Sequence, residues 1–339
     1  MKMFVKEGDH TAWRFKMSTT NFTVHRQTME DFFCSTELSE KIHIPLICLS
    51  VVNIIFALTA TMGNTLIVIA LQRETALHPP SKVLLRNLAV TDLCVGIVSQ
   101  PLQIALFLIL LYQLPQMCRY TYAVCRTART ILCGVSMLTT TAVSVDRLLA
   151  LLLRLRYGQV VTLKRIYGAV IAFWAFSTFT AAISHWDYAV WLVFGISSTS
   201  LCLVTSISCY SMIFLTLRRY QNQVRDNVQE QANQTIPLNI KRYRKTVFSG
   251  MCVQLALVSC YLPFLLVSPF AYPSRELRRS QTATFHVAVE SAVTLLHFNS
   301  SLNPILYCWK ITEVRQAVKD ALRRLFCSSN QPRTGGSGG

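Results

Sequence analysis

One carboxylate lies in the middle of a long apolar stretch, where a charged group is costly and therefore usually functional. Asp92 is the only acidic or basic residue in 87–118. Three polar side chains on other apolar stretches could reach it: Ser136, Asn299 and Asn303. A carboxylate surrounded by hydroxyl and amide oxygens suits a small, hard cation. The alternative is a neutral, hydrogen-bonded aspartic acid that holds neighbouring helices together.

A second set of residues could carry a conformational change. The guanidinium of Arg147 has five donors, so it can pair with Asp146 in one state and reach other groups in another. An arginine that only extends its charge to the membrane surface is the alternative. Pro263 and Pro304 lie inside apolar stretches, where a proline frees a backbone carbonyl and kinks a helix. Two tyrosines are candidate switch residues, the alternative being ordinary interfacial aromatics: Tyr210 and Tyr307.

Long apolar stretches position these residues. Only 14% of the 339 residues are charged, against about 25% in soluble proteins. Charge is absent from four stretches that exceed the ~20 residues a helix needs to cross a bilayer: 42–72, 166–186, 188–217 and 246–274. Two more stretches, 87–118 and 281–309, contain one acid each, and 130–145 qualifies if its helix continues past the charges at its ends. The sequence therefore predicts an all-α membrane protein, a seven-transmembrane helix bundle.

The basic residues predict the orientation of this bundle. With the N-terminus outside the cell, most of the 33 Lys and Arg residues lie on the cytoplasmic side, as the positive-inside rule requires. They are distributed over short loops between apolar stretches instead of one water-exposed face. This distribution argues against a nucleic-acid partner.

The chain divides into four predicted segments. They are an extracellular N-terminal segment (1–41), the bundle (42–311), an amphipathic interfacial helix (312–327) and a flexible cytoplasmic tail (328–339). The glycine-rich end of this tail, 335–339, resembles a linker. Asn21 lies in a glycosylation acceptor, and Cys327 is a candidate for palmitoylation. The first helix is expected to act as its own insertion signal.

Taken in order along the chain, these residues resemble the rhodopsin-like (class A) G-protein-coupled receptors. The motifs match on six of the seven predicted helices: Gly63-Asn64, Asn87 to Asp92, Asp146-Arg147, Trp174, Cys260 to Phe264, and Asn299 to Tyr307. The resemblance implies a plasma-membrane receptor that transmits an extracellular ligand to heterotrimeric G proteins by outward movement of helix six at Pro263. It implies sodium as an allosteric ion at Asp92, Ser136, Asn299 and Asn303, and no other cofactor. It also implies that Tyr210 and Tyr307 turn toward Arg147 in the active state.

The chain departs from the family pattern at its outer side. The predicted second outer loop, near residues 184–188, is very short and contains no cysteine, so the family's bridge from this loop to helix three cannot form. Cys118 and Cys125 lie one turn beyond and one turn short of the usual cysteine position. We therefore expect an irregular start of helix three, and a substitute bridge between Cys34 and Cys118. Two core positions also differ, with Cys202 for the usual helix-five proline and Tyr261 for the usual helix-six tryptophan. These departures resemble most the melanocortin, lysophospholipid, cannabinoid and adenosine group.

The outer third of helix three predicts the charge of the ligand. Amine receptors carry an aspartate where this sequence has Arg129, and Arg126 lies one turn away on the same face. The two cations favour an anionic ligand such as a lipid phosphate, a carboxylate or an acidic peptide, with Glu290 and Phe264 as further candidate contacts. The alternative stays open: both arginines could pair with Glu290 and Asp187, or extend to lipid headgroups.

Two other function classes predict features that the sequence does not display. A transporter or channel with Asp92 as an ion relay would require paired broken helices and internal repeats. An intramembrane enzyme would require a second catalytic group facing Asp92. Neither explains Asp146-Arg147 together with the series from Asn303 to Tyr307. We therefore predict a receptor with a G protein, an extracellular ligand and membrane lipids as partners, and no enzymatic activity.

Overall fold

The structure, a computed structural model, describes residue 34 and residues 41–73, 78–229, 255–271 and 283–310. The regular elements in these ranges are all helical, which confirms the predicted fold class. Their bounds are α3 (His43–Arg73), α4 (Pro79–Cys94), η1 (Val95–Ser99), α5 (Gln100–Leu111), α6 (Pro115–Leu153), η2 (Arg154–Arg156), α7 (Tyr157–Val160), α8 (Leu163–Trp186), α9 (Tyr188–Gln229), an apolar helix over Leu255–Phe270 that ends in η3 (Ser268–Ala271), and α11 (Ala283–Lys310). The helix Leu255–Phe270 is called the helix-six segment below.

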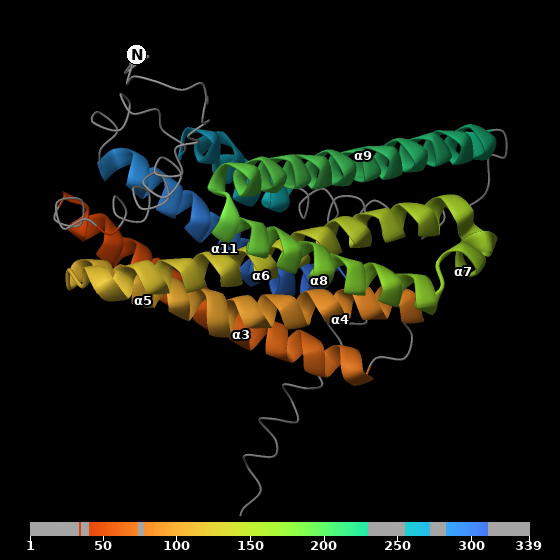
Figure 1. Cartoon of the computed structure of the whole chain (residues 1–339). Helices are drawn as coiled ribbons and strands as arrows, with labels where there is room; N and C mark the ends of the chain where they lie inside the picture. Colours follow the sequence, from red (N-terminus) through yellow and green to blue (C-terminus); the bar gives the residue numbers. More distant parts are fainter. Residues whose placement is uncertain (1–33, 35–40, 74–77, 230–254, 272–282, 311–339) are drawn as a thin grey trace, which may run out of the picture.

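The long helices lie side by side along one axis (Figure 1), with α7 and the far end of α9 together at one end. Five described spans are long and apolar enough to cross a membrane. α4, η1 and α5 form one of them, over Pro79–Leu111. The helix-six segment is a shorter apolar helix, and the 28-residue α11 packs beside α3. Helices suit this environment because their backbone groups are hydrogen-bonded within the segment, where no water is available.

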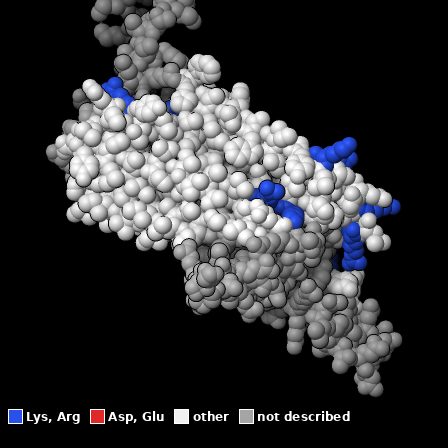
Figure 2. All heavy atoms as spheres, turned by 90° about the horizontal axis from the view of Figure 1, so that it is seen from below, with Lys and Arg blue, Asp and Glu red and all other residues white. Residues whose placement is uncertain are grey.

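The surface of the bundle fits contact with lipid. Large apolar side chains are widely exposed along the helices, among them Leu58, Ile171 and Leu201. Figure 2 shows a face whose middle is broad and uncharged, with the described Lys and Arg side chains lying mainly toward its two ends. A soluble protein would bury this much apolar surface, whereas in a bilayer it faces acyl chains.

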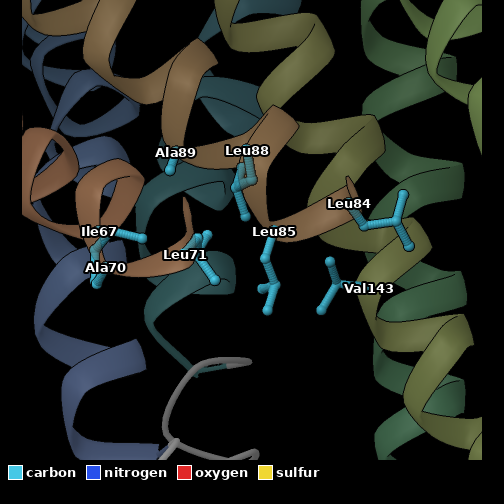
Figure 3. Packing of buried hydrophobic residues seen from close by; sticks show 8 residues of the cluster. All are labelled: Ile67, Ala70, Leu71, Leu84, Leu85, Leu88, Ala89 and Val143. Carbon is cyan, nitrogen blue, oxygen red and sulfur yellow. The ribbon is translucent and has the colours of Figure 1, made fainter. Parts of the chain in front are cut away.

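The inner half of the bundle is held by an aliphatic cluster from α3, α4 and α6 (Figure 3). Its buried members are Ile67, Ala70, Leu71, Leu84, Leu85, Leu88, Ala89 and Val143. α3 also packs closely against α11, where small residues allow the backbones to approach. A Cβ added to Gly63 would lie 2.7 Å from Cγ and 2.8 Å from Cβ of Pro304. Glycine is therefore required at position 63 by the proline ring opposite.

We expect Gly63→Ala to lower the free energy of unfolding of the purified protein by about 1–3 kcal/mol, the usual range for overpacking. The rigid ring of Pro304 cannot move aside without shifting α11. Gly168→Ala on α8 is the matched control, because an added Cβ there meets no atom within 4 Å. Unfolding temperatures in detergent measure both variants. Equal stability of Gly63→Ala and the control would contradict this packing.

The prediction for the start of helix three was wrong. The charge-poor stretch 87–118 covers the second span, which ends at Leu111, and the first residues of α6, where Cys118 lies as expected. α6 is one continuous helix from Pro115 to Leu153, so the irregular start expected for helix three is absent. Proline is tolerated at the first turn of a helix, where its missing N–H leaves no bond unmade. The irregular turn lies instead in the second span, where the wide turn η1 precedes Pro101.

The fifth span was also longer than predicted. The charge-free fifth stretch ends at residue 217, whereas α9 continues to Gln229. The added residues contain no glycine or proline, so nothing in the chain stops the helix when it leaves the apolar region. The guanidinium carbon of Arg154, at the end of α6, lies 5.9 Å from the ring centroid of Tyr220. This cation–π contact connects the extension of α9 to the bundle.

The outer side contains the predicted substitute bridge and a minimal second loop. Cys34 and Cys118 form a disulfide across 84 residues of sequence. Both sulfurs lie in a buried cluster from α3, α5 and α6. Asp187 alone separates α8 from α9. Its Oδ1 accepts hydrogen bonds from the backbone N–H groups of Ala189 (2.8 Å) and Val190 (3.0 Å), so this carboxylate caps α9.

Candidate functional site

Asp92 is the centre of a buried polar site that joins α4, α6 and α11. The carboxylate is fully buried. Its Oδ1 accepts hydrogen bonds from the hydroxyls of Ser136 and Ser300, each at 2.8 Å, and its Oδ2 accepts one from Nδ2 of Asn303 at 2.6 Å. A carboxylate with three donors from two other helices is well solvated by the protein. The site therefore ties three membrane crossings together.

The structure brings two of the three predicted partners to Asp92 and replaces the third. Asn299 is buried, but its Nδ2 has no hydrogen-bond partner among the described residues. Ser300, which the sequence analysis did not select, takes the place next to the carboxylate. Residues three and four positions apart share a helix face, so Ser300 and Asn299 both lie on the side of Asn303. The sequence pattern could not choose between them.

Further polar contacts surround this centre. Nδ2 of Asn64 donates to the backbone carbonyl of Ser300 at 3.0 Å. Nδ2 of Asn87 donates to Thr139 at 2.9 Å, and Nε1 of Trp174 donates to Oδ1 of Asn87 at 3.2 Å. These bonds link α3 to α11 and α4 to α6 and α8. Polar residues from four of the six matching motifs, on α3, α4, α8 and α11, are thus connected by hydrogen bonds inside one bundle.

A pocket lies between α6, α8, α9, the helix-six segment and α11. Its empty space is about 620 Å³, the opening included. The walls are mainly apolar and aromatic, with Met137, Phe176, Trp191, Tyr261, Phe264 and Leu296. Arg129 is the one charged residue among the described residues that line it. The predicted residues Arg129, Tyr261 and Phe264 are therefore brought together, whereas Arg126 and Glu290 are not part of this lining.

Arg129 is connected to Glu290 through a glutamine that the sequence analysis missed. Nη1 of Arg129 donates to Oε1 of Gln103 at 3.3 Å, and Nε2 of Gln103 donates to Oε2 of Glu290 at 2.8 Å. Gln103 is fully buried and Glu290 is 3% exposed. Arg126 is also buried, with its guanidinium carbon 5.4 Å from the ring centroid of Tyr122. Of the two acids proposed as alternative partners, Glu290 is thus linked to Arg129, while Asp187 caps α9.

The inner end of α6 has a different arrangement from the one expected. Asp146 is buried, and its two carboxylate oxygens accept hydrogen bonds from Ser81 (2.8 Å) and Tyr157 (2.5 Å). Tyr157 is in α7 and its ring centroid lies 4.9 Å from that of His78. Two hydroxyl groups therefore donate hydrogen bonds to the carboxylate oxygens of Asp146, with which Arg147 was expected to pair. Arg147 is half-buried at the end of this group.

The other predicted residues lie as follows. Tyr210 is buried on α9, Pro263 is in the helix-six segment, and Pro304 is inside α11 against Gly63. Tyr307 belongs to α11, but its side chain lies outside the described residues. Asn21, Cys327 and the predicted interfacial helix 312–327 also lie outside them.

Comparisons with known proteins agree with this arrangement. The family profile "7 transmembrane receptor (rhodopsin family)" matches residues 63–185. Adenosine receptor A2a of Equus caballus is 24% identical over 84% of this chain and 75% of its own length. Trace amine-associated receptor 5 of Mus musculus is 27% identical over 81% of this chain and 85% of its own length. Histamine H2 receptor of Rattus norvegicus is 25% identical over 85% of this chain and 83% of its own length.

These matches favour signalling through G proteins over the transporter alternative. They extend over the same helices that carry the motifs and include an adenosine receptor, from the group that the departures resemble, as well as amine receptors outside it. The motif order, the helical bundle and the matched relatives agree on one assignment. The chain is similar to the rhodopsin family of seven-transmembrane receptors, and its long apolar helices are those of a multi-pass membrane protein.

Proposed function

We propose that this receptor responds to a small amphipathic ligand with an acidic head group and an apolar body. The observation that carries the proposal is the pocket, whose aromatic walls enclose a single charged lining residue, the cation Arg129. Ligand sites are mostly apolar, with few polar groups that fix orientation. A cationic amine would meet no carboxylate among the described lining residues. A phosphate or carboxylate would meet a guanidinium, which binds these groups through paired donors.

The proposal places the ligand's apolar body against the aromatic side chains of the pocket. Tyr261 and Phe264 belong to the helix-six segment, close to Pro263. Contact with them gives a ligand the means to favour one position of helix six over another, because a ligand shifts an equilibrium by its differential affinity for the two states. Outward movement of helix six would then expose the inner face near Arg147 to a heterotrimeric G protein.

Sodium at Asp92 is part of the proposal. The groups at Asp92 are its own carboxylate oxygens, the hydroxyls of Ser136 and Ser300, and the amide of Asn303, whose Nδ2 faces the carboxylate. Such a set fits a small, hard cation, and Asn299 offers a buried amide beside it. The described residues contain no group of three or more His, Cys, Asp or Glu that could hold a metal ion. Sodium would act there as an allosteric ion and not as a reactant, so we expect no reaction catalysed by the chain.

An extracellular N-terminus is also proposed. The disulfide between Cys34 and Cys118 supports this orientation, because disulfides persist in oxidising compartments. With it, Asn21 and Cys34 lie outside the cell, and membrane lipids surround the apolar belt of the bundle. Glycosylation of Asn21 and palmitoylation of Cys327 would follow from the same orientation.

Arg129→Gln tests the ligand class. In cells, a second-messenger assay would compare single-chain phosphates and carboxylates, acidic peptides, and neutral and cationic analogues of the same length. We expect the acidic compounds alone to activate the wild-type receptor, and Arg129→Gln to shift their potency by about a hundredfold, since hydrogen bonds between charged groups contribute about 1.5–3 kcal/mol. Arg119→Gln is the matched control, because Arg119 is exposed near the outer start of α6.

Arg147→Ala separates binding from signalling in the same assay. It should abolish the response to every compound and leave their binding intact. Activation of the wild type by the cationic analogues, or an unchanged response of Arg129→Gln to acids, would contradict the proposed ligand class.

A further inference from the structure

We propose that Glu290 is a built-in anion that occupies Arg129 until the acidic group of a ligand takes its place. This inference rests on the proposed function, because it names what regulates the same pocket. It makes Glu290 and Gln103 positioning residues that set how strongly the receptor prefers an acidic ligand.

The geometry that supports it is a chain of three side chains on three helices. Arg129 on α6 donates to Oε1 of Gln103 on α5, and Nε2 of the same amide donates to Glu290 on α11. The amide dipole of Gln103 is thus oriented with its oxygen toward the cation and its nitrogen toward the anion. This orientation lets one amide stabilise both charges at once.

Burial makes this chain energetically important. Gln103 is fully buried and Glu290 is 3% exposed, whereas Arg129 is half-buried, so water cannot compensate the charge of Glu290. Removal of one partner of a buried ion pair strongly destabilises the folded protein, because the other charge remains uncompensated. Sγ of Cys125 adds a second donor to Oε1 of Gln103 at 3.3 Å, which helps to fix the amide orientation. The two charges are therefore held in one arrangement.

The position of the pocket decides which charge a ligand meets. Arg129 lines the pocket, whereas Gln103 and Glu290 are not among its lining residues. A ligand in the pocket therefore meets Arg129 without first meeting Gln103 or Glu290. An acidic head group competes with Glu290 for the guanidinium, while a neutral ligand leaves the chain intact. The internal anion lowers the affinity for acids and so sets a threshold for ligand binding.

Thermal unfolding of the purified receptor in detergent tests this competition, with decyl phosphate as the probe, decanol as its neutral control and decylamine as its cationic control. We expect Glu290→Gln to bind decyl phosphate about tenfold more tightly than the wild type, a difference of about 1.4 kcal/mol, with the response to decanol unchanged. The double variant Arg129→Gln/Glu290→Gln should lose the gain. Equal binding of decyl phosphate by Glu290→Gln and the wild type would overturn the proposal.

A measurement without any ligand tests the pairing independently. Glu290→Gln and Arg129→Gln should each lower the unfolding temperature, and the double variant should recover part of the loss because no uncompensated charge remains. Gln103→Met, which keeps the size of the side chain and removes the bridge, should also destabilise. Additive effects of the two charge variants would overturn the proposal. If decyl phosphate stabilises none of these proteins, the proposed preference for an acidic ligand is wrong. The non-additivity of the substitutions at positions 129 and 290 then tests the pairing of Arg129 with Glu290 by itself.

Discussion

Replacing Asp92 with leucine is expected to destabilise the receptor more than any other single substitution in the bundle. The change leaves three buried donors without an acceptor, on Ser136, Ser300 and Asn303. Each unsatisfied buried donor costs about 1–3 kcal/mol, so the total loss is comparable with the whole stability of many domains. We expect little folded protein at the cell surface and a strongly lowered unfolding temperature in detergent.

Asp92→Asn is the matched variant that separates packing from charge. Asparagine keeps the shape of the side chain and one acceptor oxygen. The unfolding temperature of Asp92→Asn should therefore lie between those of the wild type and the leucine variant. An ion that binds only the folded state stabilises it by an amount that grows with the logarithm of its concentration once the site is largely occupied. Sodium, but not choline, should therefore raise the unfolding temperature of the wild type, and Asp92→Asn should lose this response. A leucine variant as stable as the wild type would show that the three donors find other partners.

Loss of the outer disulfide is expected to have the second-largest effect. Cys34 and Cys118 close a loop of 84 residues, and removal of such a bridge typically costs about 2–4 kcal/mol. Cys34→Ser and Cys118→Ser should each lower the unfolding temperature by the same amount. The double variant should lose no more than either single variant, because both substitutions break one bond. A reducing agent should destabilise the wild type and leave the double variant unchanged.

Cys125→Ser provides the control for this bridge. Cys125 is a buried free cysteine seven residues along α6 from Cys118. Its replacement should keep the sensitivity of the wild type to the reducing agent. Insensitivity of Cys125→Ser to reduction, together with a stable Cys118→Ser, would move the bridge to Cys125 and contradict the structure.

Much of the fold could be predicted from the sequence, because the bilayer restricts the possibilities. A stretch without charge such as 166–186 can only be a helix when it crosses the hydrocarbon region, and α8 over Leu163–Trp186 follows it closely. Helix ends in water were less predictable. The polar end of α9 and the break at Leu111 depend on local capping and propensity, to which hydropathy is insensitive.

The sequence by itself determined that Asp92, Asn303 and Glu290 lie within apolar helices, because their positions inside charge-poor stretches leave no other location. Only the tertiary structure decided which of them meet. Ser300 rather than Asn299 reaches Asp92, Gln103 connects Arg129 to Glu290, and Tyr157 takes an oxygen of Asp146. The physical reason is that helical spacing fixes a face of each helix, whereas the rotation of that helix against its neighbours depends on packing such as Gly63 against Pro304.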